Sequence, residues 1–429
     1  MVPVKPAAPP PTPPPTPATP SPFPTARPSG APPTAPAASV PPPAPAAPAP
    51  AARQTFFGIY GDGVVLIDRD SNASWDPRLL GATLTHRPAD WLRFHFDVAL
   101  ERGDNFGAQQ GLVELSPHPA FGVHAGLMLL PLGIINRLYE PPSYLSVDRP
   151  LTDQLIIPAT WRELGAGIFG EIAGALRYEV DVVSALDSAG FSAQAPLSGG
   201  RGNGDRIGIR QAAVVARVEV ADLPGFACGA GGYYGPASGG DPLLDGVSVA
   251  VAETDFRFRG GGFDLRAQYA HLFILNSYRI NDYLGLVGQS AVPKNGRGGY
   301  VQAGYDLLHL GDGPSRQELL LFAAYENVNP RSAMSPYNYN PGMITGPGET
   351  PPSAPSPARQ FARGGLVYRP VPGLAFKLDV QIALSGEGPP PAPPMTVPGA
   401  PGTPVTLPPE LLEAARGASR VGLALAFAF

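Results

Sequence analysis

Histidine and carboxylate residues are the side chains in this chain that could carry acid–base or metal chemistry. His95 and Asp97 lie two positions apart in WLRFHFDVALE, so both would point to one face of a strand and could form a dyad. A charged wall explains the same pair, and we prefer that reading. The histidines are scattered and none has a spacing such as H-E-x-x-H. They are His86, His95, His118, His124, His271 and His309. We therefore expect no enzyme.

Other ligand patterns are weak. The stretch DRDSN, 68–72, resembles part of a calcium loop but lacks its full spacing. Cys228 is the only cysteine, which excludes a disulfide framework and a thiolate metal cluster. We interpret its thiol as a small buried residue and expect no metal and no cofactor.

Composition excludes two further classes of protein. Charged residues make up 15% of the 429, and the formal net charge is −5, so a basic nucleic-acid-binding protein is excluded. The longest apolar stretch, GVHAGLMLLPLGII at 122–135, is too short for a membrane helix and contains His and Pro. Strands of a membrane barrel need only about 9–11 residues each, so the absence of a long apolar stretch does not exclude a membrane β-barrel.

Alternation with a period of two runs through the body of the chain. In 91–101 and again in LAFKLDVQIALS, 374–385, large apolar residues occupy one face and charged or polar residues the other. The chain ends in RVGLALAFAF, 420–429, where large apolar residues alternate with Gly and Ala. Such strands fit a sheet whose apolar face meets lipid.

Connection lengths indicate how these strands are joined. Short turns such as RPAD (87–90) and RPVPG (369–373) follow one strand of each pair, while longer Gly/Pro-rich links follow the other. This asymmetry is typical of outer-membrane barrels. We predict an all-β, transmembrane antiparallel β-barrel of about 16 strands over 55–429, with 14 or 18 strands as alternatives.

Residues 1–54 have a different composition. Pro accounts for 22 of them, which favours extended polyproline II over a packed core. We expect a disordered Pro/Ala-rich periplasmic arm, either passive or in contact with the periplasm or cell wall. No export signal is visible at the start, so we expect that it was removed or that the true start lies upstream.

The polar faces of the strands would line the lumen. We predict that the pore-lining side chains include Arg93, His95, Asp97, Arg177, Glu179, Arg217, Arg257, Arg266, Lys377 and Asp379. Their charges are nearly balanced. A solvated wall is the simpler interpretation, and an organised path for anions is the alternative.

The connection at 131–162 is long and rich in charged and apolar residues. Such a segment is expected to fold on a surface, and the barrel lumen is the nearest one. We predict a constriction loop with Arg137, Glu140, Asp148, Arg149, Asp153 and Arg162. Packing outward, over the rim or at a subunit contact, is an equal alternative.

A family resemblance supports this assignment. The pattern PLGIIN…EPP…VDRP…IIP.TWRELG.G.FG resembles porins related to the phosphate-selective porins, most strongly over 121–190. The resemblance implies a sixteen-stranded homotrimeric outer-membrane channel with an infolded loop. Phosphate specificity is not carried over, because Lys is rare here and acids are many.

Together these features predict an outer-membrane porin, a passive diffusion channel for small hydrophilic solutes with a weak preference for anions. A plugged structural or adhesive barrel acting through long extracellular loops is the alternative. Expected partners are outer-membrane lipid and the barrel-assembly machinery. The alternating final strand, with Phe427 and Phe429, resembles the signal which that machinery recognises.

Overall fold

The computed structural model describes residues 54–68, 73–101, 105–202, 210–220, 224–310, 317–335, 355–385 and 419–429. Residues 1–53, the expected arm, lie outside the described residues, as do 336–354 and 386–418 in two of the long links. The description below concerns the compact unit Ala51–Phe429.

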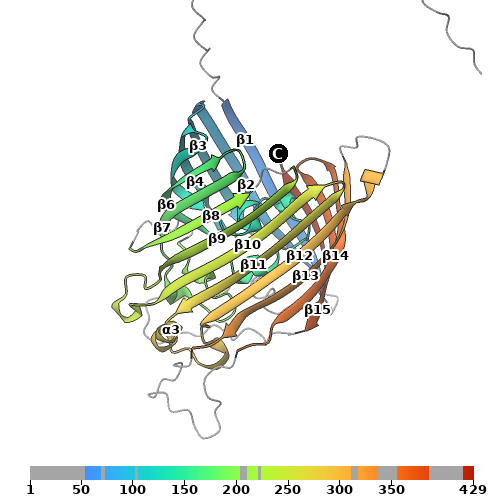
Figure 1. The fold of residues 1–429 in the computed structure, drawn as a ribbon. Coiled ribbons are helices and arrows are strands. Elements are labelled where there is room, and N and C mark those ends of the chain that lie inside the picture. The colour runs from blue at the N-terminus through green and yellow to red at the C-terminus, as the bar shows by residue number, and fades with distance from the viewer. Residues whose placement is uncertain are drawn as a thin grey trace, which may run out of the picture. The chain divides into compact units, whose positions relative to one another are not determined.

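Sixteen antiparallel strands close into one barrel, as predicted (Figure 1). Their bounds are β1 Gln54–Asp68, β2 Ala73–Ala89, β3 Leu92–Glu101, β4 Asn105–His118, β5 Phe121–Leu129, β6 Arg162–Ile172, β7 Leu176–Ser184, β8 Ala212–Val220, β9 Phe226–Pro236, β10 Ser248–Gly260, β11 Phe263–Leu275, β12 Asn295–Asp306, β13 Glu318–Ala333, β14 Arg359–Val371, β15 Leu374–Ser385 and β16 Arg420–Ala428. Each strand pairs with its sequence neighbours, and β1 pairs with β16, from Tyr60 opposite Ala428 to Asp68 opposite Arg420.

Helices occur only in the connections of the described chain. They are α1 Ile134–Arg137, α2 Leu151–Leu155 and α3 Ser277–Leu284, with 3-10 turns η1 Pro141–Ser143, η2 Ser188–Gly190, η3 Ser198–Gly200, η4 Pro242–Leu244, η5 Gly288–Ser290 and η6 Leu307–Leu310. None of these helices has the length and apolar character needed to cross a membrane.

The two ends of the barrel differ. Short connections such as 260–263 and 371–374 lie at one end, here called the turn end, together with the C-terminus (Figure 1). The connections at 129–162, 184–212, 236–248 and 275–295 start from the opposite end, here called the link end, where α3 lies. The predicted asymmetry is therefore present. Strand β2 is the longest of the described strands, because its first residues, from Ala73, pair with the end of β1 instead of forming a loop.

The outer wall is apolar. Val301 is 58% exposed and Leu423 is 44% exposed, whereas the inward Ala424 and Ala426 of β16 are buried. Exposed aromatic residues gather toward both ends: Phe57, Trp91 and Phe263 at the turn end, and Trp75, Phe106 and Tyr234 at the link end. An apolar band between aromatic girdles is typical of a barrel in a lipid bilayer.

Cys228 corrects a sequence-based interpretation. We expected a small buried residue, but the thiol is exposed on β9. The reason is the strand phase: Cys228 shares the outward face with Ala230 and the exposed Tyr234, where small and large apolar residues alike meet the surroundings of the barrel.

The interior holds an apolar cluster that alternation did not predict. At the link end the inward residues of β10 and β11 become apolar, with Val249, Val251, Leu272 and Ile274 buried. Links from other strand pairs pack on them, including Leu186, Leu197, Leu244 and Ile280. Trp161 and Tyr233 join the same cluster, with ring centroids 4.7 Å apart.

A charge on the outer wall tests the membrane-facing assignment. We expect Val301→Arg, in the middle of β12, to destabilise the barrel in lipid vesicles by about 2–4 kcal/mol, because an arginine at the bilayer midplane loses its hydration. The free energy of unfolding would be measured by urea titration. Val287→Arg is the control, since Val287 is exposed on a link outside the strands, and we expect little change. Equal costs at the two positions would contradict a lipid-facing wall.

Candidate functional site

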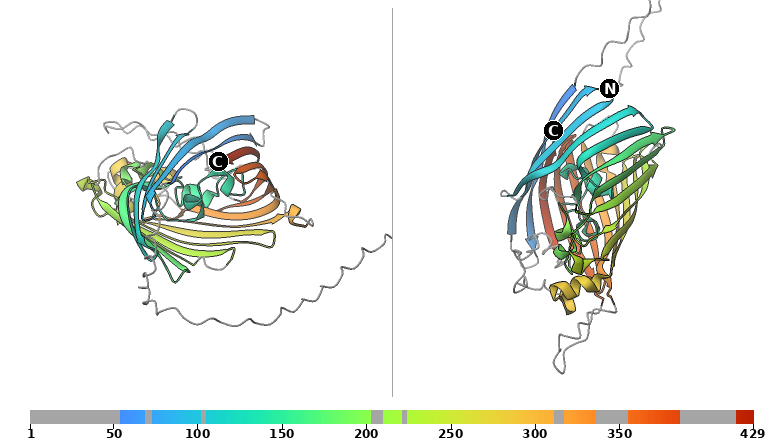
Figure 2. Two further views of the ribbon diagram at one scale, coloured as in Figure 1. Left: turned by 90° about the horizontal axis from the view of Figure 1, so that it is seen from above. Right: turned by 90° about the vertical axis from the view of Figure 1, so that its left-hand side faces the viewer.

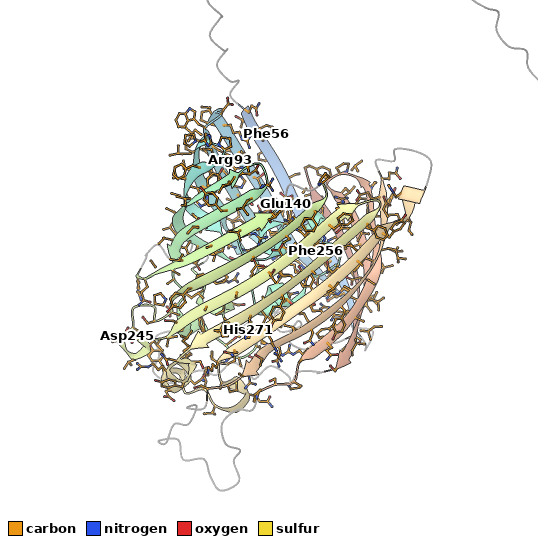
Figure 3. The ribbon with its side chains drawn as sticks, viewed as in Figure 1. Phe56, Arg93, Glu140, Asp245, Phe256 and His271 are labelled. Atoms are coloured by element: carbon orange, nitrogen blue, oxygen red, sulfur yellow. The ribbon has the colours of Figure 1, made fainter. Side chains whose placement is uncertain are left out.

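The polar residues predicted to line the lumen point inward from their strands. On β3, Arg93 pairs with Glu114 of β4, and His95 lies 2.9 Å from the Thr85 hydroxyl. Asp97 is fully buried and accepts hydrogen bonds from Tyr60 and Tyr139. His95 and Asp97 thus take different partners, and the structure does not bring them together as a catalytic dyad. Arg93 lies near the turn end of β3 (Figure 3).

A network of ion pairs covers the inner wall of β7 to β10. Arg217 contacts Glu219, Glu253 and Asp255, at 2.9, 2.7 and 2.6 Å. Arg257 and Arg177 also contact Glu219, at 3.1 and 3.7 Å, and Arg177 contacts Glu171 of β6 at 2.9 Å. Three of the predicted arginines therefore share carboxylates. As a result, this wall carries many charged groups but has a low net charge.

Segment 130–161, which joins β5 to β6, contacts inward side chains around the barrel. In the left view of Figure 2, its short helices are seen within the ring of strands. Thr152 donates its backbone N–H to Glu326 of β13, at 2.7 Å. On β15, Lys377 donates to the carbonyls of Pro141 and Ser146, and Asp379 accepts from the backbone N–H of Val147. On β11, Arg266 binds Asp264 and donates to the carbonyl of Ser143.

Small residues on the final strands leave room for apolar side chains of this segment. Leu145 is buried with Phe322, Ala375 and Ala426, and Val147 with Val64 and Ala424. A Cβ added at Gly422 would lie 3.0 Å from a methyl group of Val147. The alternation of large and small residues in β16 thus serves both faces: the large residues cover the outside, and the small ones accommodate segment 130–161.

The charged residues predicted for the constriction loop have separate partners. Arg137 contacts Glu219, Arg149 donates to the carbonyl of Tyr139, and Arg162 donates to Gln109. Glu140 is exposed (Figure 3). Arg162 already belongs to β6, where its side chain is buried.

Asp148 is surrounded by guanidinium groups of arginines that were not among the predicted site residues. Arg78 of β2 lies 2.6 Å from its carboxylate, Arg420 of β16 contacts it, and Arg363 of β14 donates to its backbone carbonyl. Burial would raise the pKa of Asp148, but Arg420, Arg78 and Arg363 hold it well below its usual range. These arginines come from strands far apart in sequence, so only the closure of the barrel could reveal them.

Asp153 is a buried acid with few neighbouring groups that would stabilise its negative charge. Its Oδ1 accepts from Gln268 at 2.8 Å, and its Oδ2 has no hydrogen-bond partner. Burial raises the pKa of Asp153 to about 8, with Glu326 adding to the effect, whereas the hydrogen bond from Gln268 opposes it. The segment is therefore held against β11 by a carboxyl group that is mostly protonated at neutral pH.

A cavity of about 500 Å³ opens against the inner wall of β3 to β8. Arg93, Arg137, Arg177 and Arg217 line it together with Glu114, Glu171, Glu179 and Glu219. His95 and His124 also reach it. Its lining thus combines both signs of charge in a space large enough for a small hydrated solute.

Comparisons with known proteins agree on the fold. No family model matches the chain, so the resemblance to phosphate-selective porins stays a prediction. An uncharacterized protein of Aquifex aeolicus (strain VF5) is 26% identical over 327 residues, which cover 73% of this chain and 71% of that protein.

Among solved structures, Salmonella typhi OmpF in complex with daunomycin matches 87% of this chain and 97% of its own, with a TM-score of 0.56 and 8% identity. Pseudomonas putida OprB at high pH covers 88% and 94%, with a TM-score of 0.49 and 12% identity. The match to OmpF agrees with the sixteen-stranded barrel described above. At such low identity the likeness is one of fold.

Asp153 predicts a pH dependence of stability. A carboxyl whose pKa is about 8 when folded and 3.8 when unfolded stabilises the fold fully below pH 3.8, and loses that contribution as pH rises to about 8. We expect Asp153→Asn to remove up to about 1.4 kcal/mol of pH dependence per pH unit between those values. Urea unfolding from pH 5 to 9 measures it.

Asp245→Asn is the control for this comparison, because Asp245 is exposed at the link end (Figure 3). Its profile should follow that of the unaltered chain. Parallel profiles for Asp153→Asn and the unaltered chain would show that Asp153 is ionised in the folded barrel.

Proposed function

We propose that this protein is an outer-membrane porin, a non-enzymatic channel through which small hydrophilic solutes diffuse passively. The observation that carries the proposal is the division of the closed wall, apolar outside and densely charged inside. A sixteen-stranded barrel is wide enough for an aqueous channel. Charged groups such as Arg217 and Glu253 on its inner face favour water and polar solutes.

Segment 130–161 is the proposed constriction. Its contacts with inward side chains of β2, β3, β8, β11, β13, β14, β15 and β16 support this role, because a segment attached on several sides narrows whatever lumen remains. On the β3 to β8 side, the cavity against Arg93, Arg137 and Glu179 is the proposed route of solutes.

A weak preference for anions is part of the proposal. Around residues 141–149 cations slightly outnumber acids: Arg78, Arg363, Arg369, Arg420 and Lys377 lie among Asp62, Asp148, Glu318 and Asp379. The β3 to β8 wall is balanced, so the expected preference is small. Phosphate specificity is not proposed.

The cellular setting follows from the same argument. We propose outer-membrane lipid as the surroundings, a homotrimer as the assembly, and residues 1–54 as a periplasmic arm in contact with the periplasm or cell wall. Phe427 and Phe429 are proposed as the assembly signal. Phe429 exchanges backbone hydrogen bonds of 2.8 Å with Ile59, so this signal also completes the closing seam.

A plugged barrel is the second candidate, and one observation favours it. The apolar cluster at the link end combines segment 130–161 with links from β7 to β12, so part of the lumen is filled with side chains. In that case the protein would act through its links as a structural or adhesive barrel.

Solute uptake distinguishes the two candidates. Vesicles containing the folded full chain should swell in isotonic solutions of small sugars and resist swelling as the sugar grows, because diffusion through a narrowed pore depends on solute size. Vesicles that contain folded barrel and do not swell with any sugar would favour the plugged form.

Charge reversal tests the constriction. Arg137 contacts Glu219 and lines the cavity, so Arg137→Glu should move the reversal potential in a salt gradient toward cations. Arg210→Glu, at an exposed position near Gly239, is the control and should leave the reversal potential unchanged. An unchanged reversal potential for Arg137→Glu would show that Arg137 does not line the solute path.

A further inference from the structure

Three potential metal ligands meet on the inner wall beside the cavity against β3 to β8, and two of them, His124 and Glu179, line that cavity. His124 comes from β5, and Glu179 and Asp181 come from β7. One ligand atom of each lies within 4.8 Å of the others. His124 Nε2 and Asp181 Oδ1 are 2.5 Å apart.

The register of the strands explains why residues from β5 and β7 meet across β6. Gly167 of β6 lies opposite both His124 and Asp181. Because glycine has no side chain, the two neighbours reach each other above it: a Cβ at this position would lie 1.8 Å from Asp181 Oδ1. Phe169 stacks on the imidazole, with ring centroids 5.1 Å apart, and fixes its orientation.

The carboxylates of this cluster differ from the others around the cavity. Glu114, Glu171 and Glu219 each have a guanidinium partner. In the described part of the chain, no ion pair joins an arginine or lysine to Glu179 or Asp181. His124 pairs with Asp181, and the charge of Arg137 acts on Glu179 only at longer range. Asp181 is fully buried, and its Oδ2 has no hydrogen-bond partner. A bound cation would stabilise these two adjacent carboxylates and would give Asp181 Oδ2 a partner.

We propose that His124, Glu179 and Asp181 form a binding site for a divalent transition-metal ion of the zinc type. One imidazole nitrogen with two carboxylate oxygens is a ligand set that Zn²⁺ accepts, and bonds of about 2.0–2.2 Å place tetrahedral ligands about 3.4 Å apart. The ligand atoms lie within 4.8 Å of one another, so small side-chain rotations would bring them to this spacing. The cavity leaves the fourth position open to water or solute.

The metal takes the place of the proton that joins His124 Nε2 to Asp181 Oδ1. That proton moves to Nδ1 or to water, and no oxidant or reductant takes part. Because the ligands must be deprotonated, affinity should fall as pH is lowered. This inference does not depend on whether the barrel conducts, since binding is measured on the folded chain itself.

Cobalt is the probe for the test, because tetrahedral Co²⁺ gives visible absorption bands. The folded full chain in detergent should bind one Co²⁺, which added Zn²⁺ displaces. We expect His124→Ala and Glu179→Gln each to weaken binding by on the order of 100-fold. His118→Ala is the matched control, because His118 lies at the turn end of the same β4–β5 hairpin and should bind as the unaltered chain does.

Folding of each variant would be checked by the heat-dependent mobility of the barrel in gels. Glu179→Gln keeps the volume of the side chain at the edge of the cavity, so it provides a folded variant even where His124→Ala fails to fold. Absence of Co²⁺ binding by the folded chain, or equal binding by the unaltered chain and both ligand variants, would overturn the proposal.

Discussion

Closure of the sheet by β1 and β16 is the constraint on which the rest of the structure depends. In a bilayer, an unpaired strand edge costs several kcal/mol for each exposed backbone group, so the first and last strands must meet. They do so from Tyr60 opposite Ala428 to Asp68 opposite Arg420, and Phe429 extends the seam to Ile59. The closing strand must then present large side chains to the outside and small ones to the inside.

Closure of the sheet also determines which side chains face the inside of the barrel. A strand with a lipid-facing side has every second residue on the inside, and many of these residues here are charged and paired across strands, as Arg217 is with Glu253 and Asp255. Toward the link end, the same inward positions become apolar and join the links in a core. Segment 130–161 combines both environments: Leu145 and Val147 pack on β16, while Asp148 is held by Arg78 and Arg420.

Alternation and the lengths of the connections were enough to predict the barrel and its strand number. They failed where local pattern carries no information. The pairing of the start of β2 with β1 depends on a partner strand, and the exposed Cys228 depends on which face meets lipid. The guanidinium cluster on Asp148 and the meeting of His124 with Asp181 over Gly167 require the register of non-adjacent strands, which no single stretch of sequence contains.

The most direct test of the account is single-channel conductance of the full chain, folded in a planar bilayer. The account predicts stepwise openings of uniform size, and a reversal potential close to zero with a small displacement toward anions, because the inner charges are nearly balanced. A barrel that is folded by its heat-dependent mobility in gels, yet produces no conductance steps, would contradict the account and identify segment 130–161 with the apolar cluster as a plug.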